Sequence, residues 1–200
     1  EGADVEIDGL GLSNREAEHL SILSYVTSEK YVDDVIQNEA VSCLVVNDEL
    51  RSIYSAEAIG RNIAYIISDK PEICFYMIHE QLCRDGLLYE KYDFEPRIGS
   101  DCNIDESVVI EHGVVIGNNV TIGPNTVVRS GSIIDDNTTI GCNTTIGSEG
   151  FQLITDGDNP PMHITHVGRC HISKNVYVGD NTCICNSLFG GETYVGEGAK

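Results

Sequence analysis

Histidines are the side chains of this sequence best suited to proton transfer near neutral pH, and three of the six lie close together. These three are His163, His166 and His171. A neutral imidazole can take a proton from an attacking nucleophile, so a histidine in this group could act as a general base. His166 and His171, five residues apart, could both ligate zinc, but no third ligand at a suitable spacing accompanies them, and the sequence predicts no metal site.

The cysteines indicate the redox environment of the protein, and its net charge argues against some kinds of partner. The eight cysteines form no Cys-x-x-Cys pair, and no export signal precedes them, so we expect reduced thiols in a cytoplasmic protein. Cys183 and Cys185 point the same way on a predicted strand, and packing explains them better than a metal does. The formal charge of -20 argues against binding to nucleic acid or to an anionic membrane surface. No apolar run approaches the roughly 20 residues of a membrane span.

A six-residue period organises the second half of the chain from Ile98 to Phe151. The first residue of every step is a β-branched aliphatic: Ile98, Ile104, Ile110, Ile116, Ile122, Val128, Ile134, Ile140 and Ile146. The second is most often Gly or an acidic residue, and the fifth is small or β-branched. This is the signature of a parallel β-helix, in which the aliphatic points inward and Gly, Asp or Asn turns the corner. Three steps per coil predict three coils over 98–151.

Residues 1–88 have a different pattern. Leu20 to Val26, Val41 to Val46 and Asn62 to Ser68 resemble short buried strands. A helix is expected from Ser28, its N-cap, to Asn38, and a second from Asp69-Lys-Pro-Glu72 to about Cys83. Strands alternating with helices indicate a small α/β domain, joined by a linker at 89–97 to a β-helix domain at 98–200.

The repeat is interrupted at 152–171, where Asp156-Gly-Asp-Asn-Pro-Pro161 predicts a turn-rich excursion from the wall of the β-helix. A loop that leaves a rigid scaffold is a natural place for a binding site. The period returns at Ile172, Val178 and Ile184. Lys200 falls at the end of a step with no capping helix, so we expect the natural protein to continue or a partner to cover this end.

Two groups of residues resemble the UDP-3-O-acylglucosamine N-acyltransferases of lipid A biosynthesis and their relatives. The first is Leu23-Ser-Tyr-Val-Thr-Ser-Glu-Lys-Tyr31, which is similar to the family's Leu-Ser-Phe-Leu-x-Asn-Pro-Lys-Tyr segment. The second comprises Ile146-Gly-Ser-Glu-Gly-Phe151, His163-Ile-Thr-His-Val-Gly168 and Val176-Tyr-Val-Gly-Asp-Asn-Thr182. The resemblance covers nearly the whole chain.

The resemblance implies a left-handed β-helix, a homotrimer with sites between subunits, and an N-terminal domain that holds the uracil of a UDP-sugar. The family's uracil-binding Phe, Asn and Tyr fall on Tyr25, Ser28 and Tyr31. Tyrosines can stack on a base, whereas Ser28 has no amide to pair with a uracil edge. Gly150 and Phe151 fall in the loop that would contact substrate. The alternative for Tyr25 and Tyr31 is a role as core aromatics.

The implied reaction moves an acyl group from a thioester to the amine of a UDP-amino sugar. The donor is either acyl carrier protein or a coenzyme A thioester, and no permanently bound cofactor is implied. The family's base is a His in a stretch that would follow Lys200, so the catalytic residue is left unassigned, with His166 and His163 as candidates, and the 200-residue chain is expected to be a poor catalyst. The alternatives are a nucleotide-sugar-binding β-helix without catalysis, and a zinc-dependent enzyme resembling β-helical carbonic anhydrases.

Overall fold

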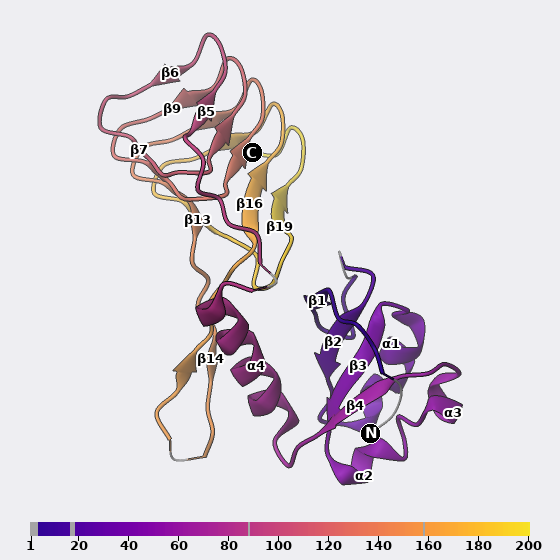
Figure 1. Cartoon of the computed structure of the whole chain (residues 1–200). Coiled ribbons are helices and arrows are strands. Elements are labelled where there is room, and N and C mark those ends of the chain that lie inside the picture. The colour runs from indigo at the N-terminus through magenta and orange to yellow at the C-terminus, as the bar shows by residue number, and fades with distance from the viewer. Residues whose placement is uncertain (1–3, 17–18, 88, 158) are drawn as a thin grey trace. The chain divides into compact units, whose positions relative to one another are not determined.

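A computed structural model describes residues 4–16, 19–87, 89–157 and 159–200 (Figure 1). The chain divides into two compact units, which are described separately. The first contains residues 1–88 and 152–164, and the second contains residues 89–151 and 165–200. Within the described residues, no helix is both long and apolar enough to cross a bilayer.

The first unit is built on a parallel four-stranded sheet in the order β1-β2-β3-β4. Its strands are β1 (Gly9–Leu10), β2 (Ile22–Tyr25), β3 (Val41–Val46) and β4 (Ala64–Ile67). Ile22, Val41 and Leu44 are fully buried at its centre. The three strands predicted from sequence are confirmed. β1 was missed because two residues are too short to show an alternating pattern.

Short helices connect these strands: η1 (Glu29–Tyr31), α1 (Val32–Gln37), α2 (Asp48–Arg51), α3 (Ala56–Ile59) and α4 (Pro71–Asp85). Ser28 is the N-cap of η1, as predicted, and its hydroxyl accepts from the Lys30 N–H. The long helix α4 begins with Pro71, whose missing backbone N–H costs nothing because the N–H groups of a first turn have no partner within the helix. It ends at Asp85, and Gly86, with φ 63°, is its C-cap. Its N-cap is Lys70 rather than Asp69, and Ser68 accepts from the Lys70 N–H.

The second unit is a parallel β-helix with three sheets along its walls (Figure 1). Residues paired on neighbouring coils confirm three six-residue steps per coil, since Val109 pairs with Val127 and Val127 pairs with Thr145. The first sheet contains β5 (Arg97–Ile98), β8 (Val115–Ile116), β11 (Ile133–Ile134), β16 (Arg169–Ile172) and β19 (Glu192–Val195). The second contains β6 (Asn103–Ile104), β9 (Thr121–Ile122), β12 (Thr139–Ile140) and β17 (Tyr177–Val178). The third contains β7 (Val109–Ile110), β10 (Val127–Val128), β13 (Thr145–Ser148) and β18 (Cys183–Cys185).

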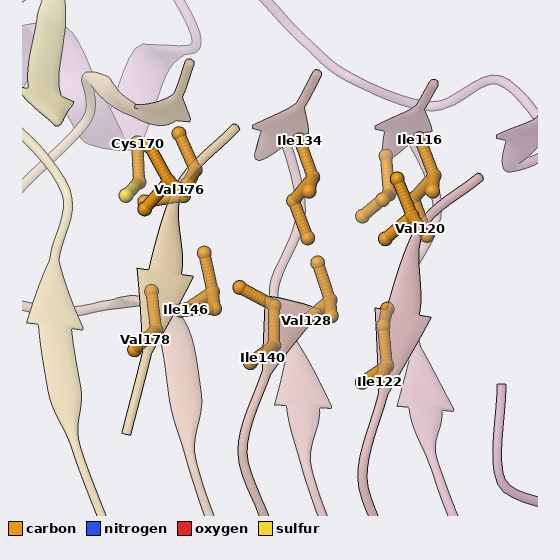
Figure 2. Close-up of a cluster of buried hydrophobic side chains, with 12 residues drawn as sticks. Ile116, Val120, Ile122, Val128, Ile134, Ile140, Ile146, Cys170, Val176 and Val178 are labelled. Carbon is orange, nitrogen blue, oxygen red and sulfur yellow. The ribbon is translucent and has the colours of Figure 1, made fainter. Parts of the chain in front are cut away.

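From Ile116 to Ile146, the first residue of each step fills the interior of this β-helix, whereas Ile98 in the first coil is exposed. Ile122, Ile140 and Val178 pair from coil to coil, and Figure 2 shows them in a row. Ile134 and Ile146 are completely buried, and each such side chain contributes roughly 1.5–3 kcal/mol of hydrophobic free energy. The small fifth residues are buried as well: Val114, Val120, Thr126, Ser132, Thr138 and Thr144. The interior therefore follows the predicted spacing.

The corners are turned mainly by the fourth residue of a step, which confirms the prediction that Asn turns the corner. Asn119, Asn137 and Asn143 have φ values of 52–59°, a left-handed conformation that Asn tolerates better than most residues. The amide of Asn119 donates to that of Asn137 one coil away, at 2.8 Å. A glycine at the second position of a step has another role, since it allows neighbouring coils to pack closely. A Cβ on Gly117 would lie 2.7 Å from the Asp136 nitrogen on the next coil.

The excursion forms an antiparallel hairpin of β14 (Leu153–Ile154) and β15 (Met162–His163) that packs within the first unit. The Gln152 side chain donates to the Tyr76 hydroxyl on α4 at 2.8 Å, and Lys70 forms an ion pair with Asp156. The chain re-enters the coil at Arg169, where β16 begins. The hairpin is thus held by side chains of the first unit, while the residues that flank it belong to the β-helix.

Candidate functional site

A cavity of about 200 Å³ opens in the β-helical unit beside the departure and return of the excursion. It lies at the ends of the strands of the third sheet. Most of its lining residues lie at the end of β7, β10, β13 or β18 or directly after it, and the others belong to the segment that leads into β16. The lining residues are Glu111, Arg129, Ser130, Gly147, Glu149, Thr165, His166 and Asn186. Distant parts of the sequence meet here because each coil places its corner above the previous one.

Two charged side chains of this cavity neutralise each other. Arg129 Nε lies 3.0 Å from Glu111 Oε1, and the other carboxylate oxygen of Glu111 accepts from the Ser130 N–H at 2.9 Å. Glu149 adds a further negative charge to the lining. The formal charge of the cavity is therefore slightly negative when His166 is neutral, which favours ligand groups that donate hydrogen bonds.

His166 and Asn186 hold each other in place. The Asn186 amide nitrogen donates to the His166 backbone oxygen at 3.1 Å, and this bond fixes which end of the amide is the oxygen. His166 Nδ1 lies 3.4 Å from the Asn186 backbone oxygen. A carbonyl only accepts, so Nδ1 carries the proton and Nε2 of the neutral ring is an acceptor. The Asn186 N–H in turn donates to the Ser148 oxygen at 2.9 Å.

Two acceptors of this pair are left unused. His166 Nε2 and Asn186 Oδ1 are buried, and neither has a hydrogen-bond partner among the residues that the structure describes. A buried polar atom without a partner costs about 1–3 kcal/mol, so such atoms are rare in folded proteins. Their presence on two residues that line one cavity marks the position where a ligand or an ordered water would be stabilised.

Gly150 allows the His166 ring to occupy this position. A Cβ added at Gly150 would lie 2.0 Å from His166 Cε1 and 2.4 Å from Nδ1, closer than any real contact. The predicted site residue Gly150 therefore acts through His166, by leaving room for the imidazole against the backbone. Phe151 is 84% exposed, and it is not among the residues that line the cavity.

A second cavity of about 200 Å³ lies in the first unit. Leu12, Ser13, Asn14, Tyr25, Val26, Thr27, Tyr31 and Glu72 line it. The Tyr25 hydroxyl donates to Glu72 at 3.0 Å, and its ring centroid is 4.9 Å from that of Phe75. Burial, with nearby Tyr76 and Glu72, raises the pKa of Tyr25, so its hydroxyl remains a donor at neutral pH. A larger cavity of about 400 Å³ shares Ser13 and Asn14 and is lined by Arg15.

The structure brings Tyr25 and Tyr31 together in this second cavity but not Ser28. The Ser28 hydroxyl is used in capping η1, and its backbone oxygen accepts from the Tyr54 hydroxyl at 2.6 Å. Sequence reasoning missed Asn14 and Glu72. Glu72 could have been found, because it lies one turn before Phe75 on a helix that packs against β2 and β3. Asn14 lies in an irregular loop whose position no sequence pattern indicates.

The other candidate histidines lie elsewhere. His163 is an exposed residue of β15 and belongs to the first unit, whereas His166 belongs to the second. Both ring nitrogens of His171 face carboxylates, Glu192 at 2.9 Å and Asp135 at 3.1 Å. Across the described ranges, no three His, Cys, Asp or Glu residues are grouped so that they could hold a metal ion.

Comparison with known families identifies the repeat. The family model for bacterial transferase hexapeptide repeats matches residues 95–130 and 113–148. Residues 95–148 thus carry the repeat of the bacterial hexapeptide transferases, a family typical of acyl- and acetyltransferases. A comparison of the sequence with curated proteins gives no match. The comparison therefore identifies the repeat over residues 95–148, and it identifies no substrate.

Replacement of Gly150 by Ala tests the coupling between Gly150 and His166. The new methyl group cannot coexist with the imidazole, so we expect the ring to leave and the free energy of unfolding to fall by about 1–3 kcal/mol. Gly179→Ala is the matched control, because no described atom lies within 4 Å of its added Cβ. Urea unfolding measures both variants, and equal stability of the two would contradict the contact.

Proposed function

We propose that this protein is an N-acyltransferase that moves an acyl group from a thioester to the amine of a UDP-amino sugar. The observation that carries the proposal is the hexapeptide-transferase repeat over 95–148, combined with a cavity at the point where the excursion leaves that repeat. The transferase repeat supports acyl transfer in general. The choice of a UDP-amino sugar rests on the segment Leu23–Tyr31 and on the cavity lined by its aromatic residues.

The reaction requires three things of the site. The amine nitrogen attacks the thioester carbonyl and forms the C–N bond of an amide, while the C–S bond breaks and the thiol leaves. The amine must lose one proton to a base, and the thiolate must gain one. The negative charge that develops on the carbonyl oxygen is stabilised by a fixed donor such as a backbone N–H. The first cavity offers buried hydrogen-bond acceptors in a low-dielectric wall, which suits the amine part of this reaction.

The second cavity is the proposed uridine site. Tyr25 and Tyr31 provide rings on which a base can stack, and Asn14 lines the same cavity with an amide that can pair with a uracil edge. Asn14 could thus supply the hydrogen bonds that Ser28 does not. Arg15, which lines the adjoining cavity, is a cation within the described lining that could contact a diphosphate.

The acyl donor is proposed to be acyl carrier protein or a coenzyme A thioester. Acyl carrier protein is itself acidic, and a formal charge of -20 repels it unless local cations offset that charge. Both donors carry the same thioester chemistry, so parallel assays with each will identify the one that is used.

The reaction is tested by incubating UDP-glucosamine with an acyl-coenzyme A or an acyl carrier protein thioester. We expect release of one free thiol per molecule of amide product, identified by mass spectrometry. UDP-N-acetylglucosamine is the control, because its amine is already acylated and should give no product. Binding of the nucleotide sugar with no product from any donor would support the alternative of a binding protein without catalysis.

The uridine site predicts a loss of UDP affinity when a stacking ring is removed. Tyr25→Ala and Tyr31→Ala should each weaken UDP binding by about 1–3 kcal/mol, or roughly ten- to a hundredfold. Calorimetry measures the affinity, and Tyr25→Phe keeps the ring if the alanine variant does not fold. Tyr177→Ala is the control, because Tyr177 is an exposed tyrosine of β17 in the other unit. Unchanged affinity in both alanine variants would refute the assignment.

A homotrimer is proposed for the assembled protein. Hexapeptide β-helices present flat walls, and closed symmetry is the usual form of homo-oligomers. Light scattering should therefore give a mass close to three times 21.8 kDa at micromolar concentration. A stable monomer would contradict the proposed trimer without affecting the fold.

A further inference from the structure

The unused acceptors in the β-helical cavity indicate the kind of group that it binds. His166 Nε2 and Asn186 Oδ1 belong to neighbouring residues of one cavity lining, and each is fixed as an acceptor by the hydrogen bond that its residue makes on the other side. A ligand that satisfies both must donate two hydrogen bonds. A hydroxyl group has one donor, whereas a neutral primary amine has two and an ammonium group has three.

We propose that this cavity is a primary-amine site, in which His166 Nε2 and Asn186 Oδ1 accept the two N–H groups of the acceptor substrate. The assignment rests on the proposed function, because it identifies where the amine of that reaction is held. A neutral amine that donates both of its N–H groups keeps its lone pair free for attack on a carbonyl, because neither acceptor donates a hydrogen bond to the nitrogen. His166 is then a binding residue that touches the reacting nitrogen, and Asn186 positions it.

The charges around the pair favour an amine over an anion. Arg129 is paired with Glu111, and the Ser130 N–H holds the same carboxylate, so the cation of this lining is already neutralised. Glu149 is a second acidic side chain of this lining. A carboxylate or phosphate would meet two hydrogen-bond acceptors to which it cannot donate, whereas an amine can donate to both.

The local packing keeps the pair in this arrangement. Gly150 leaves space for the imidazole, and the Asn186 backbone is tied to Ser148 on β13. Both acceptor atoms are buried although their residues line the cavity, so a ligand that donates to them displaces no hydrogen bond of the described residues. Hydrogen bonds made there are stronger than those made in water.

Nitrogen NMR of the histidine rings with glucosamine as the probe tests the assignment directly. In the free protein, His166 should show the form protonated at Nδ1. Addition of glucosamine should shift its Nε2 resonance, and glucose at the same concentration should not. His112 is the internal control, because it lies at an exposed corner 3.6 Å from Glu95. An equal response to glucose, or none at His166, would mean that water alone satisfies these atoms and would overturn the proposal.

Two pairs of variants make the test independent of folding failures. His166→Phe keeps a ring but removes the acceptor, and should weaken glucosamine binding at least tenfold, whereas His112→Phe should not change it. Asn186→Leu should weaken binding similarly, whereas Asn159→Leu should not change it, because Asn159 is an exposed residue of the excursion in the first unit. If Asn186→Leu leaves glucosamine binding unchanged, the acceptor role is wrong.

These outcomes separate the amine site from the proposed reaction. If glucosamine binds as described but no acyl transfer occurs with any donor, the amine site stands and the N-acyltransferase activity is refuted. If acyl transfer occurs while His166→Phe and Asn186→Leu leave both glucosamine binding and the KM for UDP-glucosamine unchanged, the activity stands and the amine site is refuted.

Discussion

The stacking of identical inward-facing aliphatics from coil to coil is the constraint on which the β-helix depends. Ile116 pairs with Ile134, and Ile134 pairs with Ile172, although the second pair is separated by the whole excursion. A shift by one residue toward the following position would move the aliphatic side chain to the outside wall and replace it by a polar or glycine residue, such as Gly117 or Asp135. The buried columns therefore fix the register of every coil, and with it the position of every corner residue.

Rigid register allows the chain to insert a hairpin without losing the fold. β13 and β18 remain paired around the excursion, with a register shift between Ile146 and Ser148 that absorbs the irregular geometry. Gly147, with φ 77°, lies at this shift, and its backbone lines the cavity. The unpartnered atoms of His166 and Asn186 are tolerated because the surrounding coils supply far more stabilisation than these atoms cost. The candidate site thus occurs where the excursion interrupts the stack of coils.

The sequence predicted those features that repeat, and it failed where contacts depend on tertiary placement. The interior positions followed from a strict period, and β2, β3 and β4 followed from their buried composition. The prediction that Gly, Asp or Asn turns the corner is confirmed, and the backbone shows that the turn falls mainly on the fourth residue of a step. Tyr25 and Tyr31 were found through a motif. Asn14 and Asn186 were not, because each lies in an irregular segment and gains its role from residues distant in the sequence.

The pKa of the Cys170 thiol indicates whether this cysteine could carry the acyl group during transfer. Transfer through a cysteine would need a thiolate, and Cys170 is a buried thiol of β16, the strand that follows the cavity segment. Burial raises the pKa of Cys170 to about 11, and the opposing effect of the Gly147 backbone is smaller. Only about one molecule in ten thousand would carry that thiolate at pH 7. A covalent acyl intermediate on Cys170 is therefore disfavoured, in agreement with the proposed direct attack of an amine on the thioester.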